Sequence, residues 1–320
     1  MIVFRKNTSS FYSIENVFEA LLPFLEIKKN ILPHASKGLI NRLKNIFFIY
    51  SHKSNLLHIT GNDHYLLCYP FENTILTIHD IEALKRKSGL KKWIFKKLWF
   101  DIPIQNAKVI TTISKFSRRE ILSLGNYTTP IKVIHNPLTL PMVHSPKVFN
   151  TKKTRILHMG TKKNKNLVRT IKALRGIDCW LTIVGKPETE ILDLLKINRI
   201  HYSIKSNLNK VEIMGEYINC DLVSFVSTYE GFGLPIIEGQ ATGRPVLTSN
   251  VASMPEVAGT GALFVNPFSV KAIRAGINKL IANEDLREDL IKKGLKNVER
   301  FKPKVIAGQY LKLYGKVLNH

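Results

Sequence analysis

Short apolar runs alternate with amphipathic patterns along most of the chain. The apolar runs have the length of buried strands, and the segments between them repeat apolar residues with helical spacing. Alternation of this kind is typical of β-α-β units, in which helices cover a parallel sheet. The predicted strands are residues 55–60, 74–79, 107–113, 132–135, 155–159, 180–184, 221–226, 245–248 and 262–265.

The helical patterns fill the spaces between these strands. One stretch, residues 136–154, contains three prolines and shows no period, which is typical of a linker. The predicted helices are residues 15–25, 117–124, 166–174, 269–282 and 303–317.

Strands and helices on both sides of the linker predict an α/β protein in which two Rossmann-like, doubly wound domains face each other across a cleft. The expected domains are residues 1–145 and residues 146–302. A C-terminal helix, residues 303–320, is expected to pack back toward the first domain. Ligands of such sheets bind beyond the carboxyl ends of the strands.

The composition is typical of a globular protein and indicates where in the cell it is expected. The chain has 320 residues, 44% of them hydrophobic, and no apolar run approaches the roughly 18–20 residues that span a bilayer. Residues 1–7 lack the apolar core of a signal peptide, so a cytoplasmic protein is expected. Cys68, Cys179 and Cys220 have no metal-type spacing and are interpreted as buried thiols of a reducing compartment.

The net charge changes this picture. Lys and Arg number 48 against 24 acidic residues, which gives a formal net charge of +24. Such a surface attracts polyanions, namely nucleic acid, an anionic membrane face or phosphorylated substrates. The alternative is a lysine bias that only keeps the protein soluble. Nucleic acid is the less favoured partner, because the sequence has no helix-turn-helix, zinc or RNA-binding signature.

The most informative segment begins just after the predicted strand 221–226. It reads EGFGLPIIE, with Glu230 before a glycine turn and Glu238 inside the helix that follows. A glycine turn that opens a helix presents backbone N–H groups and the positive end of the helix dipole. This arrangement suits a phosphate or a sugar hydroxyl. The alternative is that Glu230 caps the helix and Glu238 is a solvated charge.

The run EGFGLPIIE, followed by G-x-P-V and by P-E-V-x-G, resembles the donor-site signature of the retaining glycosyltransferase family 4, which has the GT-B fold. The resemblance implies that Glu230 contacts the hydroxyls of the donor sugar and that Glu238 binds the ribose of the nucleotide. It also implies that the backbone of Phe232, Gly233 and Leu234 faces the transferred sugar and the diphosphate.

A second segment, RILHMGTKKNKNL, leads from a strand through Gly160 and Thr161 into a basic loop. A departing nucleoside diphosphate gains negative charge, which a metal or fixed cations must stabilise. The chain has no D-x-D pattern, so no metal cofactor is expected. The loop is similar to the family's G-x-x-x-x-[RK]-[KN] stretch, whose basic residue neutralises the diphosphate. Lys165 is the first choice for that role and Lys162 the second; the alternative is solvated lysines.

A third segment, TILTIHD, places His79 and Asp80 at the end of a predicted strand. The resemblance implies that His79 reaches the donor sugar, with Asp80 orienting its imidazole, although an isolated histidine is also a common structural hydrogen-bonding group. Gly61 lies in a turn after another strand and is expected to face the cleft. Ser117 is predicted to be a helix N-cap, with Glu120 completing a capping box.

Near the N-terminus the chain departs from the family pattern. The first strand of the family is followed by a glycine-rich loop, but the first glycine here is Gly38. Thr8, Ser9 and Ser10 are candidates to supply the missing hydrogen bonds. The resemblance is close over residues 155–301 and weaker before them, in the part that selects the acceptor.

Residues 85–99, KRKSGLKKWIFKKLW, hold seven basic residues and two tryptophans. On a helix, an apolar stripe from Ile94 to Trp99 would lie apart from Lys92, Lys96 and Lys97. A basic amphipathic helix with aromatic residues is typical of a membrane surface, and the alternative is a helix that packs this stripe on its own sheet.

Together these features predict a retaining glycosyltransferase that uses a nucleoside-diphosphate sugar as donor substrate and needs no further cofactor. The expected acceptor is a glycan or lipid-linked glycan of a cell-surface polysaccharide, and an anionic membrane face is a candidate partner. A peripheral position on the inner face of the membrane would fit both. The alternatives are an inactive GT-B subunit and a basic nucleic-acid-binding protein.

Overall fold

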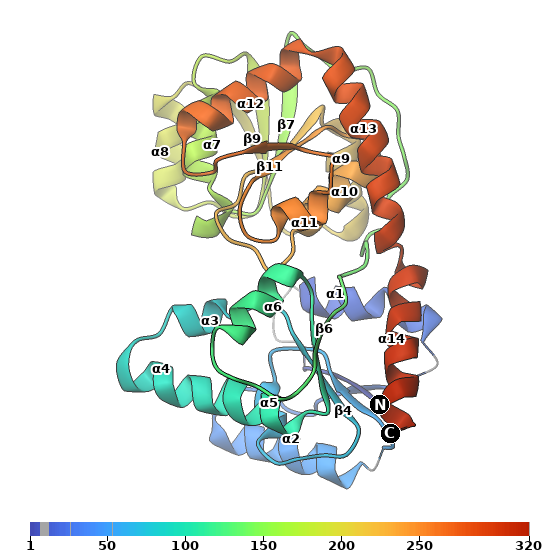
Figure 1. The fold of residues 1–320 in the computed structure, drawn as a ribbon. Helices are drawn as coiled ribbons and strands as arrows, with labels where there is room; N and C mark the ends of the chain where they lie inside the picture. Colours follow the sequence, from blue (N-terminus) through green and yellow to red (C-terminus); the bar gives the residue numbers. More distant parts are fainter. Residues whose placement is uncertain (7–12, 26, 53, 320) are drawn as a thin grey trace. The chain divides into compact units, whose positions relative to one another are not determined.

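A computed structural model describes residues 1–6, 13–25, 27–52 and 54–319. The chain divides into two compact units (Figure 1). Unit 1 comprises residues 1–139 and 303–320, and unit 2 comprises residues 140–302. The division falls six residues before the 145/146 boundary expected from the sequence. Thr8, Ser9 and Ser10 lie outside the described residues, so the structure does not bear on their expected role.

In its described residues, unit 1 contains a six-stranded parallel sheet with the strand order β2-β1-β3-β4-β5-β6. Its central strands are the predicted apolar runs, whose side chains are buried on both faces, as expected for a parallel sheet. Neither β1 nor the edge strand β2 was predicted, because β1 has only three residues and the lysine and asparagine of β2 form no apolar run. The strands are β1 (Ile2–Phe4), β2 (Lys29–Ile31), β3 (Leu57–Ile59), β4 (Thr74–Ile78), β5 (Val109–Thr112) and β6 (Ile131–Val133).

The helices predicted over residues 15–25, 117–124 and 303–317 are present in unit 1 with shifted ends, whereas the helices over residues 39–51 and 102–106 were not predicted. The pattern over residues 15–25 divides into α1 and a short 3-10 helix, η1, with Pro23 near its start. The segment 85–99 divides into α3, α4 and a π-helical turn, η3. The elements are α1 (Ser13–Glu19), η1 (Leu22–Phe24), α2 (Leu39–Ser51), η2 (His64–Leu67), α3 (Glu82–Lys85), α4 (Gly89–Lys96), η3 (Lys97–Asp101), α5 (Ile102–Asn106), α6 (Lys115–Leu122) and α14 (Pro303–Leu318).

The cap of α6 corrects one prediction. Ser114, not Ser117, is the N-cap, and its Oγ accepts a hydrogen bond from the backbone N–H of Ser117 at 3.0 Å. The Ser117 hydroxyl donates instead to the carbonyl oxygen of His79 at 2.9 Å. Glu120 completes no capping box with Ser117, and its carboxylate pairs with Lys85. The sequence places both serines near the helix start, and only the tertiary contact with His79 decides between them.

Among the residues that the structure describes, unit 2 repeats this architecture with a six-stranded parallel sheet in the order β12-β11-β10-β7-β8-β9. Its edge strand β9 was not predicted, because half-exposed and exposed polar residues dominate it. The elements are β7 (Thr154–Met159), η4 (Lys163–Lys165), α7 (Leu167–Leu174), β8 (Cys179–Val184), α8 (Thr189–Ile197), β9 (His201–Lys205), α9 (Lys210–Asn219), β10 (Leu222–Phe225), α10 (Leu234–Thr242), β11 (Val246–Ser249), α11 (Met254–Ala258), β12 (Leu263–Val265), α12 (Val270–Ala282), α13 (Glu284–Val298) and η5 (Glu299–Phe301).

Two predictions that rest on composition can be compared with this fold. Cys179 and Cys220 are buried as expected, but Cys68 is exposed just after η2, so its interpretation as a buried thiol was wrong. In the described part of the chain, no helix combines the length and apolarity required to cross a bilayer.

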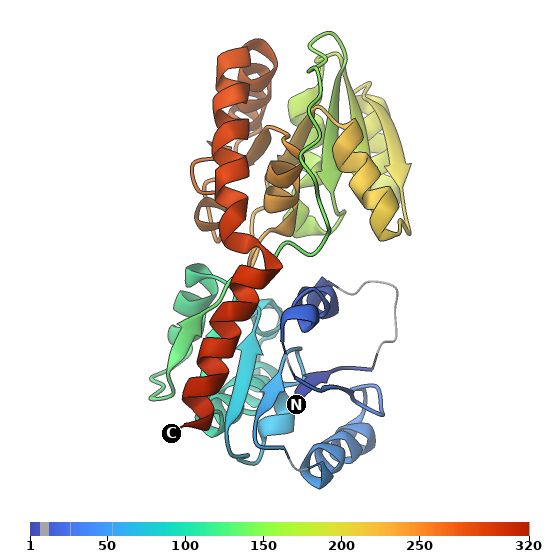
Figure 2. The ribbon, with the colours of Figure 1, turned by 90° about the vertical axis from the view of Figure 1, so that its right-hand side faces the viewer.

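A polar network in the core of unit 1 attaches α14 to the sheet. His58 of β3 is fully buried, and burial lowers the pKa of its imidazole to about 3, so the ring is neutral near pH 7. Its Nδ1 lies 2.8 Å from the hydroxyl of Tyr314, and its Nε2 lies 2.7 Å from Oγ1 of Thr77. Thr77 in turn hydrogen-bonds Thr111 at 2.7 Å. Figure 2 shows α14 running beside the strands of this unit.

We expect Tyr314→Phe to destabilise the protein, because it leaves a buried imidazole nitrogen without its partner. An unsatisfied buried polar group costs about 1–3 kcal/mol. Urea or thermal unfolding should therefore show a loss of this size. The control is Tyr202→Phe, whose hydroxyl makes no hydrogen bond in the described structure; an equal effect of both substitutions would contradict the assignment.

Candidate active site

The loops at the carboxyl end of the unit 2 sheet bring most of the predicted residues together. β7 ends just before Gly160, and β10 ends five residues before Glu230. The two strands are hydrogen-bonded neighbours in the centre of the sheet, so their following loops meet at one edge. This is the edge at which doubly wound sheets bind ligands.

Lys165 and Glu230 form an ion pair between these two loops. The Nζ of Lys165 lies 2.8 Å from Oε1 of Glu230, and both side chains are largely buried, with exposed fractions of 20% and 14%. Asn164 donates from Nδ2 to the same carboxylate oxygen at 3.1 Å and to the carbonyl oxygen of Tyr229 at 3.0 Å. Glu230 does not cap α10, whose N-cap residue is Gly233. Two charged groups are thus held in place at the sheet edge.

Gly160 explains how Lys165 reaches this position. Its φ is +89°, a left-handed conformation that favours glycine, and a Cβ there would lie 3.1 Å from the side chain of Lys165. The aliphatic part of Lys165 therefore lies against the glycine backbone, with Nζ 4.8 Å from the centroid of the Phe225 ring. Thr161 turns away to donate to the carbonyl oxygen of Lys186 at 2.9 Å. Lys162, the second candidate, is exposed at the start of η4.

The turn between β10 and α10 is held by close packing against side chains. Gly233 has a φ of +115°, and a Cβ there would lie 3.1 Å from Ile236 and 3.3 Å from Phe225. Phe232 is buried and packs edge-on against Phe301 at 5.6 Å between ring centroids, so this side chain anchors the turn. Leu234 begins α10, and no side chain caps that helix. Pro235 has no N–H, and Ile236 donates to the carbonyl oxygen of Gly233 at 3.0 Å, so the N–H of Leu234 and the positive end of the helix dipole are what suit an anion.

Ser253 holds the same turn and was not predicted from the sequence. Its Oγ lies 2.9 Å from the carbonyl oxygen of Glu230 and 2.6 Å from that of Phe232. The residue precedes the P-E-V-x-G run, so its position next to a motif was the available signal. Asn164 was likewise not predicted, because the lysines on either side of it made charge the dominant feature of the loop.

Glu238 is buried on α10, so the alternative of a solvated surface charge is wrong. Burial raises the pKa of its carboxyl group from an ordinary value of 4.5 to about 7, although the hydrogen bond from Tyr217 and the charge of Lys165 both lower it. The Tyr217 hydroxyl donates to Oε2 of Glu238 at 2.6 Å. Tyr217 lies on α9 and is fully buried. Tyr217 was not predicted from the sequence, because it belongs to no motif and meets Glu238 only when α9 and α10 pack in the fold.

His79 and Gly61 lie together in unit 1. His79 follows β4 directly, and its Nε2 is 2.8 Å from the carbonyl oxygen of Thr60, the residue before Gly61. A carbonyl only accepts, so Nε2 carries the proton and Nδ1 is left as an acceptor. Burial lowers the pKa of the imidazole, which keeps it neutral. One carboxylate oxygen of Asp80 accepts from the N–H of Glu82 at 2.8 Å, and the charge of Asp80 raises the pKa of the His79 imidazole, so its orienting role stays a prediction.

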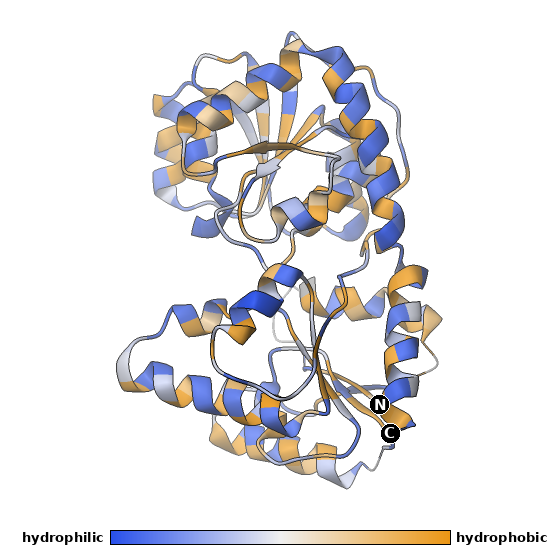
Figure 3. Ribbon diagram, in the orientation of Figure 1, coloured by the Kyte–Doolittle hydropathy of each residue, from blue (hydrophilic) through white to orange (hydrophobic). Residues whose placement is uncertain are grey.

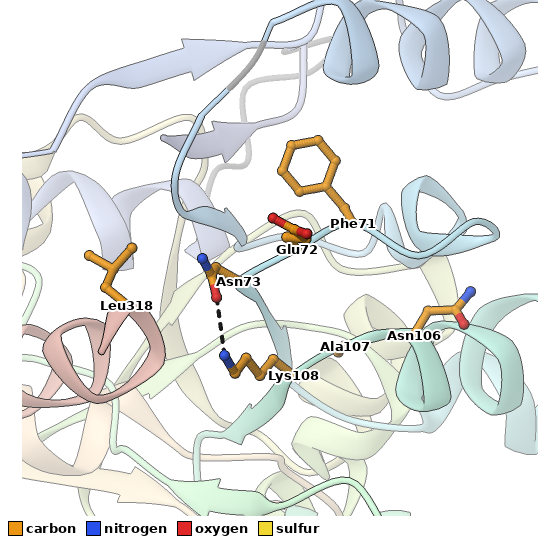
Figure 4. A pocket seen from close by; sticks show the side chains of 7 residues that line it. All are labelled: Phe71, Glu72, Asn73, Asn106, Ala107, Lys108 and Leu318. Atoms are coloured by element: carbon orange, nitrogen blue, oxygen red, sulfur yellow. Dashed lines mark hydrogen bonds between the residues drawn. The ribbon is translucent and has the colours of Figure 1, made fainter. Parts of the chain in front are cut away.

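A hollow of about 480 Å³ in unit 1 lies elsewhere (Figure 4). It sits at the amino ends of β4 and β5, beside the C-terminus of α14, and Lys108 donates there to Oδ1 of Asn73 at 3.2 Å. None of the predicted site residues lines it. Its lining residues are Phe71, Glu72, Asn73, Asn106, Ala107, Lys108 and Leu318.

Residues that commonly hold metals do not gather in this structure. Over the described ranges, no group of three or more His, Cys, Asp and Glu side chains is arranged to bind a metal ion. The charged groups at the carboxyl end of the unit 2 sheet are held by contacts with other protein groups.

Comparison with known proteins shows what unit 2 resembles. Residues 143–297, nearly all of unit 2, match the family described as "Glycosyl transferases group 1". The match covers just under half of the chain. The predicted resemblance and the predicted enzyme class are thereby confirmed, and an inactive subunit or a nucleic-acid-binding protein is not favoured.

Curated relatives within this class are distant in sequence. The chain is 26% identical to an O-antigen chain mannosyltransferase B of Escherichia coli over 271 residues, which are 76% of this chain and 70% of the relative. It is 22% identical to an N,N'-diacetylbacillosaminyl-diphospho-undecaprenol alpha-1,3-N-acetylgalactosaminyltransferase of Campylobacter jejuni, over 88% of this chain and 71% of the relative. A mannosyltransferase of Salmonella typhimurium is matched over only 61% of its length, at 24% identity.

Solved glycosyltransferases share the fold. Anabaena Alr3699/HepE in complex with UDP and glucose matches with a TM-score of 0.79 and 14% identity, over 98% of this chain and 99% of that one. A glycosyltransferase from Rickettsia africae matches with a TM-score of 0.74 and 17% identity, over 99% and 97%. The predicted fold class, with two Rossmann-like α/β domains of the GT-B type, is confirmed.

We expect Tyr217→Phe to raise the pKa of Glu238 above its value of about 7, because the substitution removes a hydrogen bond that stabilises the ionised carboxylate. A raised pKa in the folded state means that stability is lost as pH rises from about 4.5 through the folded pKa. This loss should extend to higher pH in Tyr217→Phe. The measurement is the free energy of unfolding between about pH 5 and 9, with Glu238→Gln as the control whose profile lacks this component. An unchanged profile in Tyr217→Phe would contradict the coupling.

Proposed function

We propose that this chain transfers a sugar from a nucleoside-diphosphate sugar to a lipid-linked glycan during synthesis of a cell-surface polysaccharide. The observation that carries the proposal is the Lys165–Glu230 ion pair near the buried Glu238. The pair lies at the carboxyl end of the unit 2 sheet, where α10 begins. The similar structure with UDP and glucose supports the donor class. The names of the Escherichia coli and Campylobacter jejuni relatives support an acceptor of this kind.

The ion pair suggests how a donor is received. A diphosphate carries more charge than one carboxylate and would take Lys165 as its counter-ion. Glu230 would then be released to accept hydrogen bonds from the sugar hydroxyls. The N–H of Leu234 and the positive end of the α10 dipole would bind the phosphate. Glu238, once ionised, would accept from the ribose hydroxyls, while Thr161 and Lys162 stay predicted contacts from the family resemblance.

The proposed chemistry is transfer with retention of configuration, as the resemblance implies. The bond from the anomeric carbon to the leaving phosphate oxygen breaks while the acceptor oxygen attacks on the same face. The acceptor proton passes to the departing diphosphate. In this route the protein supplies orientation and charge stabilisation by Lys165, without a metal ion. His79 and Gly61 remain predictions of the resemblance, with Nδ1 of His79 offered to a sugar hydroxyl.

We also propose that the protein works as a peripheral protein on an anionic membrane face. A lipid-linked acceptor lies in the membrane, and a net charge of +24 favours attraction to anionic lipid. Nucleic acid is not part of this proposal.

Nucleotide binding is the first test of the donor site. A nucleoside diphosphate that binds the folded state should raise the melting temperature by mass action, and one of UDP, GDP and ADP should do so more than the others. Glu238→Ala should abolish the shift. The control is Glu288→Ala, an exposed glutamate of α13. No shift with any of the three nucleotides would refute the proposed donor site.

Turnover tests the role of Lys165. We expect Lys165→Ala to lower kcat by about 100-fold or more, the usual cost of losing one group that stabilises developing negative charge. Lys163→Ala is the matched control, because Lys163 is exposed in the same loop and should leave kcat unchanged. Release of nucleoside diphosphate in the presence of polyprenyl-diphosphate-linked saccharides would be measured, with and without EDTA. Strong inhibition by EDTA would contradict a metal-independent reaction.

A further inference from the structure

Two helices of unit 1 expose large apolar side chains that no described part of the chain covers. On α2, Phe47 is 75% exposed, and on α4, Trp93 is 64% exposed. Each belongs to a stripe with helical spacing. The exposed residues of these stripes are Leu39, Ile40, Leu43 and Phe47 on α2, and Leu90, Trp93, Ile94 and Leu98 on α4 and η3. We call these eight residues the apolar surface.

The exposed stripes are separate from the faces that hold the helices in place. α2 buries Ile49 and packs Ile46 and Phe48 on the core of unit 1. In the segment 85–99, Phe95 and Trp99 pack on that core, whereas Ile94 and Leu98 are exposed. The stripe predicted from the sequence is therefore split: half of it packs internally, and the other half belongs to the apolar surface. The fold does not need the exposed half.

The two helices are neighbours. The guanidinium of Arg42 on α2 lies 4.7 Å from the ring centroid of Trp99 in η3, next to Leu98. The same group lies 5.7 Å from the ring of Tyr65 in η2. Figure 1 shows α2 and α4 along one side of unit 1, and Figure 3 shows a mainly hydrophobic α2 beside an α4 with alternating hydropathy. The apolar residues thus come from adjacent elements.

The charges around the apolar surface are mostly positive. Residues 27–62 and 83–100, which contain both helices, include no Asp or Glu. Lys96 is paired with Asp101 at 2.7 Å, but no described acidic group pairs with Lys91, Lys92 or Lys97, and all three are exposed. Lys44 adds a further exposed cation on α2. The excess positive charge complements an anionic partner.

We propose that the apolar surface, with Lys44, Lys91, Lys92 and Lys97, is the docking surface of this protein on an anionic lipid bilayer. Tryptophan, phenylalanine and leucine side chains insert at the boundary of headgroups and acyl chains, while lysines reach the lipid phosphates. A nucleic acid would use the cations but gain little from eight exposed apolar side chains. This proposal rests on the proposed function only because that function gives the protein a reason to bind a membrane. It assigns no step of the chemistry.

The test is flotation of the full chain with vesicles of phosphatidylcholine, alone or with about 30% phosphatidylglycerol. We expect binding to the anionic vesicles at 0.1 M NaCl, much weaker binding to neutral vesicles, and release at 1 M NaCl because salt screens the charges. The triple variant Lys91→Gln, Lys92→Gln and Lys97→Gln should weaken binding about 100-fold. The matched control replaces the exposed unit 2 residues Lys271, Lys279 and Lys292 by Gln and should bind nearly as the wild type.

Apolar variants separate this surface from simple charge attraction. Phe47→Ser with Trp93→Ser should weaken binding at least tenfold, whereas Ile197→Ser with Val211→Ser, equally exposed in unit 2, should not. All four variants should keep the thermal shift by nucleotide, which shows that they fold. Binding that is unchanged in both surface variants overturns the proposal, as does an absence of binding to anionic vesicles.

Further outcomes distinguish the docking surface from the proposed function. Vesicle binding without any nucleotide shift would refute the donor site but support the surface. A nucleotide shift without vesicle binding would leave the donor site and refute the surface. Self-association that Phe47→Ser abolishes, in the absence of vesicle binding, would also refute it, because the surface would then serve a second copy of the chain.

Discussion

Hydrogen bonding between β7 and β10 is the constraint on which the candidate site depends. The two strands are about 65 residues apart in the sequence, yet they are parallel neighbours in the sheet. Their pairing places the loops that follow them side by side, so that Lys165 and Glu230 meet at 2.8 Å. The glycines at 160 and 233 then allow each backbone to turn where an ordinary side chain would collide. The geometry of the candidate site follows from strand order together with these two glycine turns.

Burial divides the two glutamates of the motif into different chemical roles. Glu230 is paired with a lysine and held by an amide, whereas Glu238 is enclosed beside a tyrosine hydroxyl, which leaves its pKa near neutrality. In the proposed function, an anion that competes for Lys165 would release the carboxylate of Glu230. The second titrates close to physiological pH, so its ability to accept hydrogen bonds depends on Tyr217.

Sequence patterns predicted the parts of this protein whose information is local. Apolar runs located the central strands, and the EGFGLPIIE and GTKKNKN segments located the loops of the candidate site, because strand ends and glycine turns have local signatures. The edge strands β2 and β9 escaped, because a half-exposed strand needs no apolar run. Hydrogen-bond partners that are distant in the sequence were also not predicted. Examples are Tyr217, Ser253 and the contact of Ser117 with His79. The exposure of Trp93 and Phe47 required the structure, because helical spacing alone does not reveal which of two apolar faces is covered.

The return of α14 to unit 1 has a consequence for biosynthesis. Unit 1 is discontinuous, with its first 139 residues and its last helix separated by the whole of unit 2. On a ribosome, residues 140–302 emerge and can form their sheet before the final helix exists, while His58 still lacks the hydroxyl of Tyr314. The nascent chain therefore presents an incomplete unit 1 with an open polar core until residues 303–318 have emerged. Any agent that protects the nascent chain must shield the part of unit 1 that is made first for the longest time.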